Sequence, residues 1–177
     1  MWGGDNMVNK KNRKNLLLAL FIGALLLAGC GKAAPEAEKA ALLGIDVSAA
    51  EILSQEDSHG GFHGDGITWI RFACEGTDIA RQIAEKENWA PFPLNDTVKA
   101  LVYGIEEGTA QIGPYLLDED GGLLIPEIEN GYYLLIDRQA EEGKASGADI
   151  LHRASLNFIL GIYDSDTDML YYAEMDT

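Results

Sequence analysis

The chain has 177 residues, of which 29 are Asp or Glu and 13 are Lys or Arg, so its formal net charge at pH 7 is −16. So acidic a protein would be repelled by nucleic acid and by anionic lipid headgroups, which excludes binding to either through charge attraction. It has only two cysteines, which excludes a small domain stabilised by several disulfides and leaves the hydrophobic core to stabilise the fold.

The first thirty residues have the parts of a targeting segment. The basic residues near its start are Lys10, Lys11, Arg13 and Lys14. An apolar run follows over residues 16–27, shorter than the ~20 apolar residues that a transmembrane helix needs. Two small residues, Ala28 and Gly29, then precede Cys30. This order of basic, apolar and small residues is typical of a signal peptide.

Residues 27–30 read Leu-Ala-Gly-Cys and resemble the lipobox of bacterial lipoproteins. The resemblance covers the first thirty residues, and it implies that a diacylglycerol thioether forms on Cys30 and that a dedicated peptidase cleaves just before it. An ordinary signal peptide cut nearby, or an uncleaved anchor helix, is the alternative. We therefore expect residues 1–29 to be a lipoprotein signal peptide and the mature chain to be lipid-anchored, facing the extracytoplasmic side of the cell membrane.

The residues before Met7 differ from a usual basic n-region. Residues 3–5 read Gly-Gly-Asp, which GGA-GGN-GAY can encode, and that nucleotide sequence contains a ribosome-binding site. We therefore expect translation to start at Met7.

Cleavage before Cys30 would leave a mature chain of 148 residues, the length of one ordinary domain. With 9 Lys or Arg and 28 Asp or Glu, this chain would have a net charge of −19. No basic patch then assists membrane binding, so the acyl chains alone must supply it. If Cys30 is lipidated, Cys74 has no partner for an intramolecular disulfide.

Residues 30–44 are expected to carry the lipid and a tether rich in Ala, Glu and Lys, and residues 45–177 to form one domain. At the start of this domain, Ser48 is expected to cap a short helix that reaches Leu53. A loop rich in Gly, His and Asp is expected to follow over residues 55–66.

Alternating apolar residues predict a strand over residues 67–74. Helical spacing predicts a helix over residues 77–88, and an Asn or Asp cap predicts a second short helix over residues 95–103, ended by Gly104. A strand over residues 98–103 is the alternative to that second helix.

The second half reads as a series of strands. Their expected ranges are 111–117, 122–125, 132–138, 156–163 and 169–175. The first two would form a hairpin around an acidic turn, and the last two would form another. We therefore expect an α+β fold with one mainly antiparallel sheet and one or two helices packed on one face. The other face would stay partly wet, at Asn157, Tyr163, Tyr172 and Glu174.

Residues 57–66 hold the densest set of candidate ligands in the chain. These candidates are Asp57, His59, His63 and Asp65. Imidazole and carboxylate together suit Zn²⁺ or a similar ion, and four glycines would let the loop fold sharply around it. A catalytic metal would need a third ligand such as His152. A polar surface loop, or histidines that bind backbone groups, is the alternative.

Two other groups are weaker candidates. Residues 164–168 look like the start of a calcium loop, but Met169 and Met175 stand where an EF-hand has Gly and Glu. A hairpin turn explains these acids better, with weak Ca²⁺ binding as the alternative. Cys74 ends an apolar strand face, so we expect a buried thiol rather than a nucleophile.

Residues 57–66 and 163–177 resemble small uncharacterised lipoproteins of gut-type Gram-positive bacteria. This resemblance covers most of the mature chain and implies no activity. The sequence also has no phosphate-binding loop, dinucleotide fingerprint, nucleophile elbow or zinc-peptidase motif. We therefore expect a non-enzymatic binding or interaction module for a protein, peptide or small-molecule ligand.

Two other functions remain open. A small metal-dependent hydrolase would use His59 and His63 to bind its metal. An inhibitor or immunity-type module would use its acidic surface as a decoy for a basic enzyme.

Overall fold

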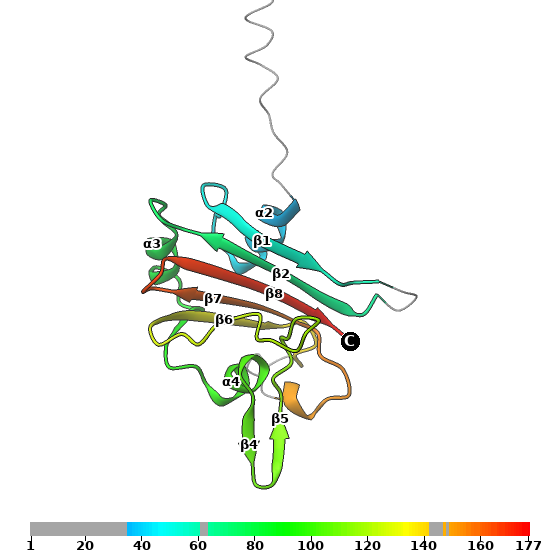
Figure 1. The fold of residues 1–177 in the computed structure, drawn as a ribbon. Helices are drawn as coiled ribbons and strands as arrows, with labels where there is room; N and C mark the ends of the chain where they lie inside the picture. Colours follow the sequence, from blue (N-terminus) through cyan, green and yellow to red (C-terminus); the bar gives the residue numbers. More distant parts are fainter. Residues whose placement is uncertain (1–34, 61–63, 142–146, 148) are drawn as a thin grey trace, which may run out of the picture. The chain divides into compact units, whose positions relative to one another are not determined.

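In a computed structural model of the chain, the residues described are 35–60, 64–141, 147 and 149–177. They belong to one compact unit, Pro35–Thr177. A six-stranded sheet in the order β1-β2-β8-β7-β6-β3 forms its centre (Figure 1). Its strands are β1 Glu51–Asp57, β2 Gly66–Ala73, β3 Ala90–Pro91, β6 Gly131–Asp137, β7 Phe158–Asp164 and β8 Met169–Asp176. Every neighbouring pair is antiparallel.

Short helices and a separate hairpin complete the unit. The helices are α2 Pro35–Ala40, η1 Ala41–Leu43, α3 Ile79–Ala84, α4 Asp96–Val102 and η2 Ile150–His152. The hairpin joins β4 Ile105–Glu107 to β5 Ala110–Ile112 and projects beyond α4 (Figure 1). The expected α+β fold with a mainly antiparallel sheet is confirmed. Within the described residues, no helix combines the length and the apolar character that crossing a membrane requires.

Both faces of the sheet are covered. On one face, α2, η1 and α3 pack on side chains such as Ile70 and Tyr172. On the other, α4, η2 and the segment that follows β5 pack on side chains such as Phe158 and Leu160. The expectation of a partly wet face at Tyr163 and Tyr172 is wrong, because these side chains are 3% and 0% exposed in the first core.

The central strand β7 explains why both faces are covered. All seven of its residues are buried, and its large apolar side chains enter the two cores alternately: Ile159 and Tyr163 on one face, Phe158, Leu160 and Ile162 on the other. Gly161 lies at its middle, where a Cβ atom would stand 2.8 Å from side-chain atoms of both Leu43 and Trp89. The missing side chain at residue 161 therefore lets η1 and the segment before β3 pack against the sheet.

The start of the domain differs from expectation. Glu51–Asp57 forms the edge strand β1, where a short helix and the start of a loop were expected. It pairs with β2 from Glu51 opposite Ala73 to Asp57 opposite Thr68, with an irregularity between Ile52 and Ser54. Nearly all of its side chains are exposed, so no apolar alternation marks it as a strand.

The other expected elements vary in accuracy. The predicted β7–β8 hairpin is confirmed, and so is helix α4, whose Asn95 side chain accepts a hydrogen bond from Val98 N–H at 2.8 Å. Helix α3 is shorter than expected. The expected hairpin over residues 111–125 is formed only in part: β5 pairs with β4, and the turn after Leu117 carries a single antiparallel bridge to Leu123 and a hydrogen bond from Leu124 N–H to Leu116 C=O.

Candidate functional site

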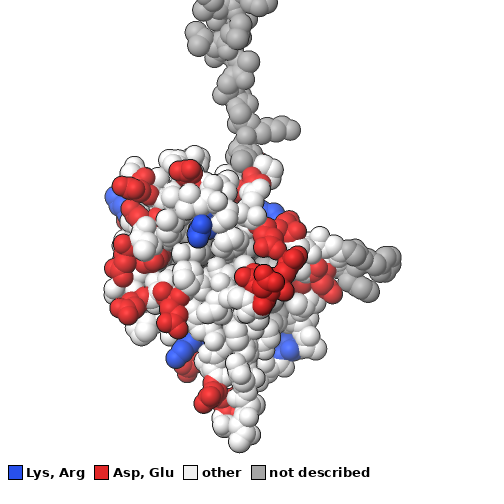
Figure 2. Space-filling view, viewed as in Figure 1, with Lys and Arg blue, Asp and Glu red and all other residues white. Residues whose placement is uncertain are grey.

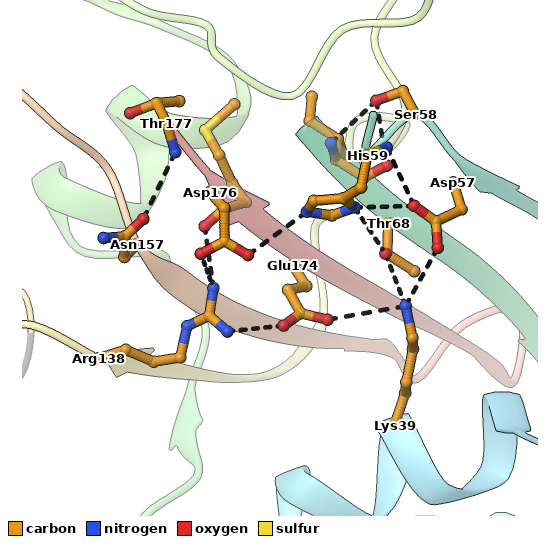
Figure 3. A network of polar contacts seen from close by, with 12 residues as sticks. Lys39, Asp57, Ser58, His59, Thr68, Arg138, Asn157, Glu174, Asp176 and Thr177 are labelled. Carbon is orange, nitrogen blue, oxygen red and sulfur yellow. Dashed lines mark hydrogen bonds and ion pairs between the residues drawn. The ribbon is translucent and has the colours of Figure 1, made fainter. Parts of the chain in front are cut away.

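A polar network links α2, the end of β1 and the ends of two other strands (Figure 3). Its ionisable members are Lys39, Asp57, His59, Arg138, Glu174 and Asp176. The β-sheet creates the network, since Asp57 and Thr68 are opposite each other in β1 and β2, and Thr68 is opposite Glu174 in β8.

His59 is held by Asp57, two residues before it. The His59 backbone N–H donates to Asp57 Oδ1 at 3.1 Å, and ring atom Nδ1 lies 2.8 Å from the same oxygen. Thr68 Oγ1 lies 3.2 Å from Nδ1. A carboxylate only accepts hydrogen bonds, so Nδ1 carries the proton that it shares with Asp57. This arrangement fixes the orientation of the ring.

The other ring nitrogen of His59 faces Asp176. Nε2 is buried and lies 3.4 Å from Asp176 Oδ2, within ion-pair distance but without the alignment of a hydrogen bond. A histidine that binds a metal commonly donates its second ring N–H to a carboxylate. Of the two ring atoms, Nε2 is therefore the one that could bind an ion, and Asp57 would orient the ring rather than act as a ligand.

Lys39 attaches α2 to this end of the sheet. Its Nζ donates to Thr68 Oγ1 at 2.8 Å and to Asp57 Oδ2 at 3.3 Å, and lies 3.9 Å from Glu174 Oε2. Its side chain is 35% exposed. Because water screens such a pair, each contact contributes modestly.

Arg138 closes the network on the side of β6. It donates to Glu174 Oε1 at 2.7 Å and also to Asp176. Glu174 and Asp176 are two residues apart in β8, which places their side chains on the same face of the sheet. One guanidinium therefore bridges two carboxylates and reduces the repulsion between them.

The charges around Asp57 change its acidity. Partial burial raises the pKa of this carboxyl, but hydrogen bonds from His59 and Lys39, together with the charge of Lys39, outweigh that effect and lower the pKa to about 2. Asp57 is therefore ionised at neutral pH and acts only as an acceptor. The neighbouring hydroxyl of Ser58 is engaged by the backbone of Ile67, to which it donates at 3.2 Å and from which it accepts at 2.9 Å.

The predicted metal ligands are only partly brought together. Asp57 and His59 are in contact, whereas Asp65 is exposed and forms no hydrogen bond or ion pair with the described residues. His63 and Cys30 lie outside the described residues. Across the described ranges, no group of three or more His, Cys, Asp and Glu side chains is placed to hold a metal ion. Zinc binding by the full predicted set stays a prediction.

His152 does not join this cluster. It ends η2 and lines a hollow of about 660 Å³ together with residues of α4 and β4. It therefore belongs to the side of the sheet covered by α4, whereas the charged network lies beside α2.

The remaining candidates have structural explanations. Asp164 accepts hydrogen bonds from Asp166 N–H at 2.9 Å and from the Thr167 hydroxyl at 2.6 Å, which are the bonds of a hairpin turn. The expected burial of Cys74 is confirmed at 1% exposure. Burial, with a smaller effect of Asp168, raises the pKa of this thiol to about 12, so it is not a thiolate at neutral pH.

Sequence reasoning missed a second candidate site along β1. Two hollows flank this strand, one on each face of the sheet. The first, of about 240 Å³, lies between α2 and β1. The second, of about 140 Å³, lies between β1 and residues 117–124. Neither hollow could be inferred from the sequence, because β1 itself was not expected.

The chain matches no protein-family model, no curated protein and no solved structure.

Proposed function

We propose that this protein is a lipid-anchored binding module, whose acidic domain binds a basic protein or peptide outside the cytoplasm and catalyses no reaction. Its charge is the observation that supports this most directly. Residues 35–177 contain 28 Asp or Glu and 8 Lys or Arg. Acidic side chains are spread over the face of the domain seen in Figure 2, with few basic ones between them. Such a surface attracts basic partners and repels acidic ones.

The polar network supports binding over catalysis. The charged groups in it are directed at one another, and the Ser58 hydroxyl is bound to the backbone of Ile67. A hydrolytic site needs a nucleophile or a metal-bound water beside a free base. Within the described residues, the network offers instead a fixed connection between α2 and the sheet.

Binding is tested with the full chain in a non-ionic detergent. The probes are two extended peptides of equal length, one rich in Arg and Val and one with Glu in place of every Arg. We expect the Arg peptide to bind, the Glu peptide not to bind, and the affinity to fall as salt rises from ~0.1 M to ~1 M, because the Debye length shortens from ~10 Å to ~3 Å. Equal binding of both peptides, or binding of neither, would refute the proposed function.

The anchor is tested separately in cells. Cys30→Ser removes the thiol that would carry the lipid, so we expect no lipid labelling and no cleavage before residue 30. Cys74→Ser is the matched control, because it removes the other thiol and should leave labelling and processing as they are. Unchanged labelling and processing of Cys30→Ser would disprove the lipoprotein assignment.

A further inference from the structure

The strand β1 is one end of the sheet. Among the described residues it pairs with β2 only, although it is seven residues long and contains no proline. Ser58 N–H donates to Ile67 C=O, so the backbone groups of residue 58 point toward β2. Backbone groups alternate between the two sides of a strand, so those of Gln55 and Asp57 point away from β2. They form an edge to which another strand can bond.

The first hollow lies on the face that carries α2. Gln55 and Asp57 lie on this face, opposite Ile70 and Thr68 in β2. All four line the hollow, and Glu36 and Glu56 also border it. Lys39 of α2 lines it too and is paired with Asp57. The hollow has an apolar base in Ile70, and its three carboxylates (Glu36, Glu56 and Asp57) outnumber the one cation, Lys39, so it fits a long side chain that ends in a positive charge.

The second hollow lies on the opposite face. Glu56 is opposite Trp69, and the indole forms part of its wall, together with Leu117 and Leu124. Its acidic border consists of Glu56, Asp118 and Glu119. The indole Nε1 of Trp69 is buried and has no hydrogen-bond partner within the described structure. A cationic side chain here would contact an aromatic ring and carboxylates together.

We propose that the outer edge of β1 accepts an extended basic segment of a partner protein as an additional strand, with successive side chains entering the two hollows in turn. This inference rests on the proposed function and specifies where its partner binds. Side chains of an added strand alternate between the faces of the sheet, so hollows on both faces match this mode of binding. Backbone hydrogen bonds would hold the segment, and the hollows would select its side chains.

Charge excludes a second copy of this chain as the occupant. β1 contains Glu51, Glu56 and Asp57 and no basic residue. Two such strands side by side would bring like charges together, which destabilises the pair. A basic segment places opposite charges in the same positions. The irregularity between Ile52 and Ser54 limits regular pairing to residues 54–57.

The edge is tested by Gln55→Pro in the full chain, with the Arg-rich peptide as the probe. Proline removes the N–H of residue 55, which points away from β2, so the β1–β2 ladder stays intact while strand addition is blocked. We expect the affinity for the peptide to fall about tenfold or more, since a lost backbone bond and a steric clash together exceed ~1.4 kcal/mol. Thermal unfolding of the variant shows whether the fold is intact.

A charge variant makes the test independent of proline. Glu56→Lys reverses a charge that borders both hollows, and we expect at least a tenfold loss of affinity. Glu107→Lys is the matched control, because it makes the same change at an exposed position of β4. We expect it to lower the affinity by about twofold at most, through the change in net charge alone.

Hydrogen exchange supplies a direct readout of the added strand. Peptide binding should slow exchange at the backbone amides of Gln55 and Asp57, because these would become bonded. If the Arg-rich peptide binds but Gln55→Pro and Glu56→Lys both leave its affinity unchanged, the edge inference is overturned while the proposed function stands. A dimer of the free protein that Gln55→Pro abolishes would likewise overturn it, because a second copy would then occupy the edge.

Discussion

The two edges of the sheet are built in different ways. The edge at β3 has two residues, and the second is Pro91, which has no backbone N–H to offer. Trp89, just before it, is 4% exposed, and its Nε1 donates to Leu43 C=O at 3.3 Å. The edge at β1 is seven residues long, and its apolar side chains Ile52 and Leu53 are 36% and 40% exposed. The β3 edge is closed to further strand pairing by packing, whereas the β1 edge is protected against pairing with another chain only by charge and an irregular pairing.

The largest expected effect is on stability at the β3 edge. Trp89→Ala would leave a cavity under η1 and beside Gly161, so we expect the free energy of unfolding to fall by ~3–5 kcal/mol. The matched change at the other edge, Leu53→Ala, should alter it by at most ~0.5 kcal/mol, since the side chain is exposed. Urea unfolding of both variants measures the difference. Similar losses in the two variants would show that packing does not distinguish the edges.

The ion pair on the β3 side of the sheet should also contribute more to stability than the ion pair at β1. At the end of β6, the strand that pairs with β3, the Asp137 carboxylate is 0% exposed and accepts two hydrogen bonds from Arg153, each of 2.7 Å. Arg153→Met would leave a buried carboxylate without its cation. Because Arg153 is partly exposed, we expect a loss of about 2–3 kcal/mol, slightly below the usual ~3–5 kcal/mol for a fully buried pair.

The control for this variant lies at the β1 edge. Lys39→Met breaks the pair with Asp57, whose side chains are 35% and 52% exposed, and should cost at most ~1 kcal/mol. If urea unfolding shows that Lys39→Met destabilises the protein more than Arg153→Met, the network at β1 has a larger structural role than its exposure indicates.

The smallest expected effect is a pH dependence from the β1 edge. The pKa of Asp57 is lowered from 3.8 to about 2 in the folded state. Between pH 3.8 and about 2, the unfolded chain binds a proton at Asp57 that the folded chain does not. The contribution of Asp57 to stability is therefore present above pH 3.8 and is lost as the pH falls through about 2. Solvent screening makes it small, because the side chain is half exposed.

Asp57→Asn removes this titration. The difference in unfolding free energy between the native chain and Asp57→Asn, measured by urea unfolding from pH 6 to pH 2, should therefore shrink as the pH falls. A difference that stays constant over this range would show that the charge of Asp57 does not stabilise the folded state.

The sequence predicted the elements whose pattern is local. The strands β7 and β8 are mostly apolar over seven or eight residues and are flanked by turn residues, and α4 has an asparagine cap followed by apolar positions at helical spacing. β1 could not be found in this way, because its exposed side chains follow no pattern and only pairing with β2 makes it a strand.

Only the part of the candidate site whose residues are close in sequence was predicted. Asp57 and His59 are close in sequence and were identified together. Lys39 is 18 residues from Asp57, and Arg138 is 36 residues from Glu174, so only the sheet order brings them into one network. One local signal was present. Glu174 and Asp176 are two residues apart in an expected strand, so their carboxylates lie on one face, where a nearby cation would stabilise them.

Trp89, which packs over Gly161, gives the domain an intrinsic fluorescent reporter. The indole of Trp89 and the side chain of Leu43 meet above this residue, and Leu43 belongs to the helical segment that also carries Lys39 toward β1. A displacement of that segment would change the polarity around the indole. Once Trp2 and Trp69 are replaced by Phe, the fluorescence of Trp89 therefore reports, without any added label, whether α2 and η1 stay in place when the exposed edge is occupied.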